Sequence, residues 1–194
     1  LSQVGGTLSA EGGLQLDTLH QTGGSLTTQG DLEVRHDFSQ GESGSIAVGG
    51  DARISDASGG TTVGQLDVTG DLALVSTDGD IVQAPGTAIT VDGGTTLSAG
   101  ADDIRLDGGG NDFRGPVNAS GHDVTLVDGQ GGIVLGDVTA GGALVVTSRD
   151  GDIGQQTGTA IDVRDNASFI APGSRVTLAD GGNSIGGKVL IDTG

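Results

Sequence analysis

The sequence has no cysteine, methionine, tryptophan or tyrosine, and only three of its 194 residues are phenylalanine. The absence of cysteine excludes a disulfide scaffold and a cysteine-ligated zinc site. Because aromatic residues are so scarce, a core must be built from valine, isoleucine, leucine and alanine. Only eight basic residues stand against 26 acidic ones, giving a net charge of −18. That balance argues against binding to nucleic acid or to an anionic membrane surface.

Two further shortages concern helices. The chain has 40 glycines, each of which costs about 1 kcal/mol in a helix interior relative to alanine, so long helices are disfavoured. No apolar run reaches the roughly 18 residues of a spanning helix, so we expect no membrane insertion. The acidic residues are 23 aspartates against three glutamates, and aspartate favours turns by bonding to its own backbone. We therefore expect many short strands joined at acidic corners.

A short repeat accounts for the apolar residues of the first third. The segment 6–16 matches 24–34 at an offset of 18, and the same template returns over 44–54 at a further offset of 20. The shared pattern is two short runs of alternating apolar residues on either side of a glycine corner. This recurrence excludes the disordered interpretation of an acidic, glycine-rich chain.

A longer repeat, with an offset of 72, occupies the rest of the chain. Segments 79–117 and 151–189 are copies of it and share 16 identities in 39 positions without a gap. Inward positions stay apolar, as where Leu97 becomes Phe169. Each coil is expected to begin at an apolar-x-apolar pattern, and such patterns divide the long repeat into three coils. They begin near residues 8, 26, 46, 66, 89, 117, 138, 161 and 189. The segment 104–113 is the hardest to assign to a position within a coil.

A coil of about 20 residues is too short to bury its own apolar face and must stack on its neighbours. We predict an all-β fold, a right-handed parallel β-helix of eight or nine coils forming one domain over 1–194. Six Asp-Gly pairs would serve turns with positive φ; because Asp-Gly is also a hairpin signal, a β-sandwich is the alternative. The stretch Arg35–Ser45, with Arg35, His36, Asp37 and Phe38, is predicted to protrude as a loop.

The strings Gly110–Val117, Val124–Leu126, Leu144–Thr147 and Ala167–Phe169 resemble the repeat region of filamentous-haemagglutinin-like exoproteins. The resemblance covers roughly residues 60–194. It implies a β-helical shaft of a large adhesin that is exported by two-partner secretion in Gram-negative bacteria. Such a protein would be secreted or tethered at the bacterial surface and would need an outer-membrane transporter. Since the chain does not begin with methionine, we expect a fragment of a larger protein.

Candidate sites are few. His20, His36 and His122 show no spacing typical of a shared metal site or a catalytic triad. Calcium is the one metal for which the sequence offers candidate ligands. Its candidate ligands are the pairs Asp78/Asp80 and Asp150/Asp152, together with Asp112 in a single faint copy of the Gly-Gly-x-Gly-x-Asp motif. We favour solvated turn aspartates there, and an Asn111 side chain that hydrogen-bonds along the coil. We predict no cofactor and no catalytic residues.

The predicted function is a structural shaft of an adhesin that acts in adhesion, aggregation or biofilm formation. Other parts of the parent protein would contact a host-cell or bacterial receptor or a matrix polysaccharide. The alternative is a β-helical polysaccharide-active enzyme or a glycan-binding module. A polysaccharide groove usually carries aromatic or basic side chains, and this sequence has few of either. An enzyme would need two carboxylates about 5–10 Å apart in a groove.

Overall fold

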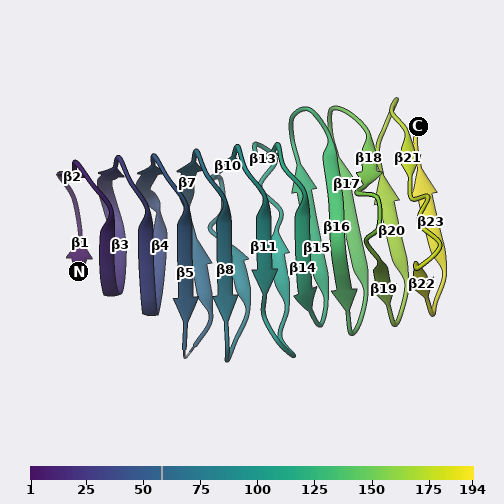
Figure 1. Cartoon of the computed structure of the whole chain (residues 1–194), viewed down its shortest axis with the longest axis horizontal. Coiled ribbons are helices and arrows are strands. Elements are labelled where there is room, and N and C mark those ends of the chain that lie inside the picture. Colours follow the sequence, from purple (N-terminus) through teal and green to yellow (C-terminus); the bar gives the residue numbers. More distant parts are fainter. Residues whose placement is uncertain (58) are drawn as a thin grey trace.

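The computed structural model describes residues 1–57 and 59–194. Its strands stack side by side along one axis, perpendicular to that axis, with the two termini at opposite ends (Figure 1). The strands are β1 Ser2–Gln3, β2 Thr7–Ala10, β3 Leu14–Thr28, β4 Leu32–Val48, β5 Ala52–Asp56, β6 Thr61–Val63, β7 Gln65–Val68, β8 Leu72–Ser76, β9 Ile81–Gln83, β10 Ile89–Val91, β11 Thr95–Ser98, β12 Ile104–Leu106, β13 Asp112–Phe113, β14 Val117–Gly121, β15 Val124–Asp128, β16 Ile133–Ala140, β17 Leu144–Ser148, β18 Ile153–Gln155, β19 Ile161–Val163, β20 Ala167–Ile170, β21 Val176–Thr177, β22 Ser184–Ile185 and β23 Val189–Asp192.

Every pairing between these strands that the register describes is parallel, so the hydrogen bonds run from each turn to the next. The fold is the predicted right-handed parallel β-helix, with about ten turns. Among the described residues no helix has the length and apolar character needed to cross a bilayer. The β-sandwich alternative is wrong, because a sandwich of hairpins would pair its strands antiparallel.

Each turn has three sides, and equivalent sides stack into three columns of strands. The first column runs through Leu26, Ile46, Leu66 and Ile89. The second runs through Leu32, Ala52, Leu72, Thr95 and Val117. The third runs through Thr61, Ile81, Ile104, Val124, Leu144 and Ala167.

The core is the stack of inward side chains from the three columns. Leucine, isoleucine and valine at these positions are almost completely buried, and the three phenylalanines are among the largest buried side chains. Outward positions alternate with them as a half-buried strand requires. The rows lose cover at the last turn, where Val189, Leu190 and Ile191 are each about half exposed.

The predicted protruding loop at Arg35–Ser45 is wrong. These residues lie in β4, which follows β3 around a whole turn, and Phe38 is fully buried. The two residues that lengthen this turn from 18 to 20 enter as register shifts between Leu16/Thr18 and Gln21/Gly23 of the paired strand β3. Each shift adds one residue at a corner, so the period grows without interrupting the ladder.

The predicted division of the long repeat into three coils is also wrong. Ile89 lies in the first column, whereas Ile161, its equivalent in the next copy, pairs with Val138 in the second. One long repeat leads from the start of β10 to the start of β19, its equivalent, and contains the nine strands β10 to β18. Strand β16 covers two sides of a turn, because it pairs with both β18 and β19, so the repeat contains ten sides. Ten sides at three per turn make three and one third turns. A residue of one repeat therefore lies one column further around the axis than its equivalent in the repeat before. The strand pairing also assigns 104–113 to positions within the turn, because β12 lies in the third column and β13 in the first.

Candidate functional site

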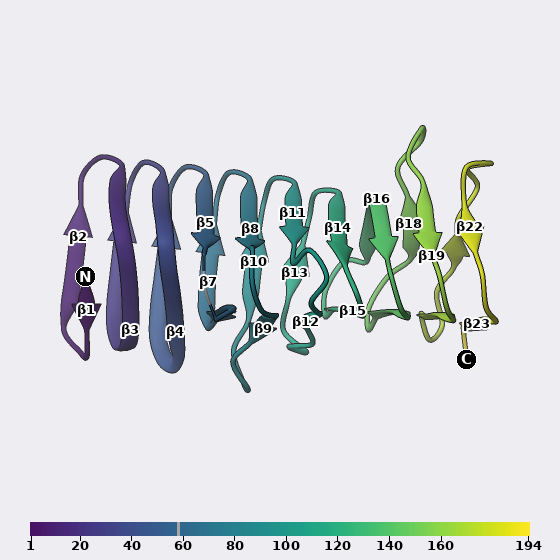
Figure 2. The same cartoon turned by 90° about the horizontal axis from the view of Figure 1, so that it is seen from below.

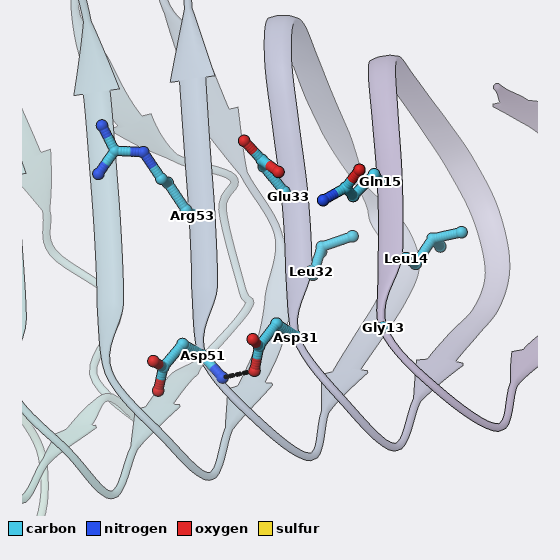
Figure 3. Close-up of a pocket in the computed structure, with 8 residues that line it drawn as sticks. All are labelled: Gly13, Leu14, Gln15, Asp31, Leu32, Glu33, Asp51 and Arg53. Atoms are coloured by element: carbon cyan, nitrogen blue, oxygen red, sulfur yellow. Dashed lines mark hydrogen bonds between the residues drawn. The ribbon is translucent and has the colours of Figure 1, made fainter.

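The corners of the helix carry most of the aspartates. Asp31 Oδ1 accepts a hydrogen bond from the backbone N–H of Asp51 at 2.9 Å, and Asp51 Oδ1 accepts one from Asp71 at 2.9 Å (Figure 3). Asp71 Oδ1 continues the series to the N–H of Gly94 at 2.7 Å. The sequence-based expectation that aspartate would bond its own local backbone is therefore wrong here, because the acceptor serves the next turn. This cross-turn bond continues the ladder around corners where the strands end.

The glycines before Asp51 and Asp71 leave room for the carboxylate of the preceding turn. A Cβ on Gly50 would overlap Asp31 Oδ1, and one on Gly70 would overlap Asp51 Oδ1. Of the glycines in the six Asp-Gly pairs, only Gly79 and Gly151 have positive φ. The prediction that all six serve such turns is therefore wrong.

An open groove beside the aspartate series lies on the second column. It has a volume of about 640 Å³, and its lining comprises Gly13, Leu14, Gln15, Asp31, Leu32, Glu33, Asp51 and Arg53. Figure 3 shows Glu33 and Arg53 extending outward from neighbouring strands. Arg35 donates two hydrogen bonds to Glu33, at 3.0 and 3.1 Å, and these hold the pKa of the Glu33 carboxyl below its usual value. The pair is exposed to solvent, so it contributes little to stability.

A reciprocal amide pair closes the loops between the third and first columns. Asn111 donates to Gln83 Oε1 at 2.9 Å and accepts from Gln83 Nε2 at 2.7 Å. It also accepts from the N–H of Ile89 at 2.9 Å and donates to Val127 O at 3.2 Å. The predicted role of Asn111 is confirmed. Gln155 and Asn183 form the same pair in the next copy of the long repeat, in a less buried setting.

Two aspartates, Asp56 and Asp128, are buried. Asp128 accepts hydrogen bonds from the N–H groups of Phe113 at 2.9 Å and Gln130 at 3.0 Å, and its side chain is fully covered. Burial raises the pKa of Asp128 to about 6 despite these bonds, and the charge of Asp112 adds to the rise. Asp56, its equivalent in the preceding repeat, likewise accepts from the N–H of Phe38.

The candidate calcium ligands do not converge. Asp80 and Asp152 each accept a backbone N–H of the next turn, from Asp103 at 3.0 Å and Arg175 at 2.8 Å. Asp78 and Asp150 are exposed at turns, and Asp112 is paired with Arg114 at 2.8 Å. None belongs to the one group of three potential metal ligands found in the part of the chain that the structure describes.

That group consists of Asp103, His122 and Asp123, whose ligand atoms all lie within 4.8 Å of one another. The sequence offered no local motif for it, because Asp103 and His122 stand 19 positions apart in the chain. One turn of this region spans about that distance along the chain, since Ile104 pairs with Val124. The period is the signal that could have found the group.

A second histidine also gains partners through stacking. His20 Nδ1 lies 2.8 Å from Ser39 Oγ, and its Nε2 lies 3.1 Å from Asp37 Oδ2. These are the residue types of a hydrolytic triad, but the two ring nitrogens have exchanged partners, since in the triad Nε2 faces the serine and Nδ1 faces the aspartate. Ser39, however, lies within β4 and pairs with His20 on one side and with Thr62 on the other. Its backbone is therefore engaged in the ladder and cannot supply oxyanion donors. His36 is exposed, 3.9 Å from Asp17.

The chain matches one family of known protein repeats. Two consecutive segments, residues 49–120 and 121–192, match a family described as repeats of unknown function (DUF5649). Each matched segment is as long as the offset that relates 79–117 to 151–189. No curated protein and no solved structure matches the chain.

Proposed function

The chain belongs to the family of repeats of unknown function DUF5649, and we propose that it serves as the structural shaft of a secreted or surface-tethered bacterial adhesin. The observation that supports this most is the parallel ladder, which continues from the first turn through both repeats. A ladder of this kind transmits load along the rod through many backbone hydrogen bonds at once.

The corners support the same role. Strands alone would leave the backbone unpaired where the chain changes side, and such gaps would be weak points. Cross-turn acceptors such as Asp51 and Asn118 fill these places, with the Asn118 side chain accepting the N–H of Asp137 at 2.9 Å. The negative surface then repels neighbouring rods and limits lateral aggregation.

The setting of the shaft belongs to the same proposal. The resemblance to filamentous-haemagglutinin-like exoproteins implies a parallel β-solenoid with tandem repeats. It also implies export through an outer-membrane transporter. The receptor or matrix polysaccharide would bind elsewhere in the parent protein. No calcium requirement and no enzymatic activity are proposed for this segment.

A distance measurement tests the shaft. Because the chain has no cysteine, single cysteines at Ser9 and Ser168 allow two dyes to be attached near the ends. We expect a narrow distance distribution that salt does not change. Inserting a second copy of 121–192, without the cysteine, after residue 120 places it between the two dyes and adds three and one third turns, which should lengthen their separation by about 16 Å at about 4.8 Å per turn. A broad, salt-dependent distribution, or no lengthening, would contradict the proposal.

A binding assay separates the shaft from the alternative. Beads coated with the chain should show no saturable binding to a panel of bacterial and host polysaccharides, and a reducing-sugar assay should show no cleavage. Saturable glycan binding that is lost in Arg53→Ala would place a binding site in the groove of Figure 3. It would overturn the proposal that this segment is a shaft and that ligands bind elsewhere in the parent protein.

A further inference from the structure

The side chains of Asp103, His122 and Asp123 meet at the corner that leads into the third column. His122 Nδ1 lies 3.3 Å from Asp103 Oδ1 and 3.5 Å from Asp123 Oδ1. All three side chains are about half exposed, so solvent and ions reach them. The two aspartates come from adjacent turns, and the histidine precedes the second of them.

The two carboxylates are already held in place by the backbone. Asp103 Oδ1 accepts the N–H of Asp123 at 3.0 Å, and Asp123 Oδ1 accepts the N–H of Ala143 at 2.7 Å. Gly142 leaves room for them, because a Cβ there would overlap Asp123 Oδ1 and lie 3.0 Å from a ring carbon of His122. Carboxylates that backbone hydrogen bonds already hold at a corner lose little freedom when an ion binds.

The spacing fits the coordination sphere of a small transition-metal ion. Tetrahedral zinc has metal–ligand distances of about 2.0–2.2 Å, which sets neighbouring ligand atoms about 3.4 Å apart. The two distances from the imidazole nitrogen, 3.3 and 3.5 Å, match that separation. Imidazole with carboxylates suits zinc and related divalent ions, whereas calcium and magnesium prefer oxygen ligands alone.

We propose that Asp103, His122 and Asp123 form a binding site for one divalent transition-metal ion of the zinc class, with water completing its coordination. The surroundings favour a cation. Asp80 lies in the preceding turn and accepts the N–H of Asp103. Within the described residues neither Asp103 nor Asp123 pairs with lysine or arginine. The site does not depend on the shaft role.

The chain contains a natural comparison for this site. Asp31 and Asp51, one long repeat earlier, form the same stack with the same backbone hydrogen bond at 2.9 Å. Gly50 stands there where His122 stands in the later repeat, so the imidazole ligand is missing. The earlier stack is therefore expected to bind zinc far more weakly, and a stoichiometry of one ion per chain distinguishes the two corners.

Isothermal titration of the chelator-treated chain with zinc chloride tests the proposal. We expect one equivalent to bind, and His122→Ala to abolish that binding. Asp103→Asn keeps an oxygen acceptor for the Asp123 N–H but loses the charge, and should weaken binding at least about tenfold. His36→Ala and His20→Ala are the matched controls and should bind as the parent chain does. Circular dichroism checks that each variant stays folded.

A second readout locates the ion directly. Zinc should shift the Nδ1 resonance of His122 in nitrogen-15 spectra and leave those of His20 and His36 unchanged. The proposal is overturned if the parent chain takes up no zinc, or if both His122→Ala and Asp103→Asn bind it as the parent does. It is equally overturned if one equivalent of calcium binds as tightly as zinc and His122→Ala leaves that binding unchanged, since the ligands would then be oxygens alone.

Discussion

Replacing Asn111 with alanine should be among the most damaging single changes in this chain. Asn111 is fully buried and makes five side-chain hydrogen bonds, two with Gln83 and one each with Ile89, Val127 and, at 3.5 Å, the carbonyl of Leu106. Alanine removes all five and leaves the partner groups without these acceptors or donors in the interior. Each orphaned buried group costs about 1–3 kcal/mol, and partial relaxation reduces the sum, so we expect a loss of about 4 kcal/mol in the free energy of unfolding.

Asn183→Ala is the matched control. It removes the equivalent bonds, which join the side chain to Gln155 at 2.7 and 2.8 Å and to the N–H of Ile161 at 2.9 Å. Both amides are only partly buried, so water replaces the lost partners. We expect a loss of about 1 kcal/mol.

Urea unfolding followed by circular dichroism measures both variants. Equal slopes against urea would show that both report on the same cooperative transition. If the two losses are equal, or if Asn111→Ala costs less than Asn183→Ala, burial does not set the energetic worth of the amide pair and the reasoning fails.

Three further changes test other parts of the structure. Thr95 is inward and fully buried, and its hydroxyl finds no partner among the described residues, so Thr95→Val should raise the unfolding free energy by about 1 kcal/mol; a decrease in urea midpoint would refute this. The pKa of Asp128 is raised to about 6, so its contribution to stability is full below the unfolded value of 3.8 and is lost as pH rises through about 6. Asp128→Asn should remove at most about 3 kcal/mol of this decline in urea titrations between pH 4 and 7, while Asp150→Asn, at an exposed turn, should leave the slope unchanged. Gly79 has φ of 110° and a Cβ there would lie 2.7 Å from the nitrogen of Gly60, so Gly79→Ala should cost about 2 kcal/mol or more, whereas Gly12→Ala, with nothing within 4 Å, should lower the melting temperature little.

The sequence was sufficient to predict the parallel helix because its signal is redundant. The alternation around Leu26, Ile46 and Leu66 repeats at nearly constant offsets, and these three residues stack in the structure. The buried Asn111 was also predictable, since its equivalent Asn183 recurs in the next copy of the long repeat in the same glycine-rich context. Both rest on periodicity, which a single sequence displays directly.

Errors arose where the period changes. The additional residues near Arg35 and Glu42 have the polar, irregular look of a loop, yet one extra residue at each of two corners leaves the strand pairing intact. At 104–113 the apolar pattern permits several phases, and only the pairing of Ile89 with Leu66, and of Ile161 with Val138, reveals the shift between columns. The Asp103, His122 and Asp123 group depends on the turn length at one corner, which short motifs do not encode.

The fractional number of turns in the repeat has a consequence for any tandem array. The loop between β9 and β10 and its equivalent between β18 and β19 point to different sides of the rod (Figure 2). Over successive repeats such features would wind around the axis as a threefold screw and return to the same side after three repeats, roughly 48 Å at ten turns. A partner meeting the rod from any direction would find the same surface at that spacing. Such an array has no preferred side, so it need not rotate about its axis for a given surface to face a partner.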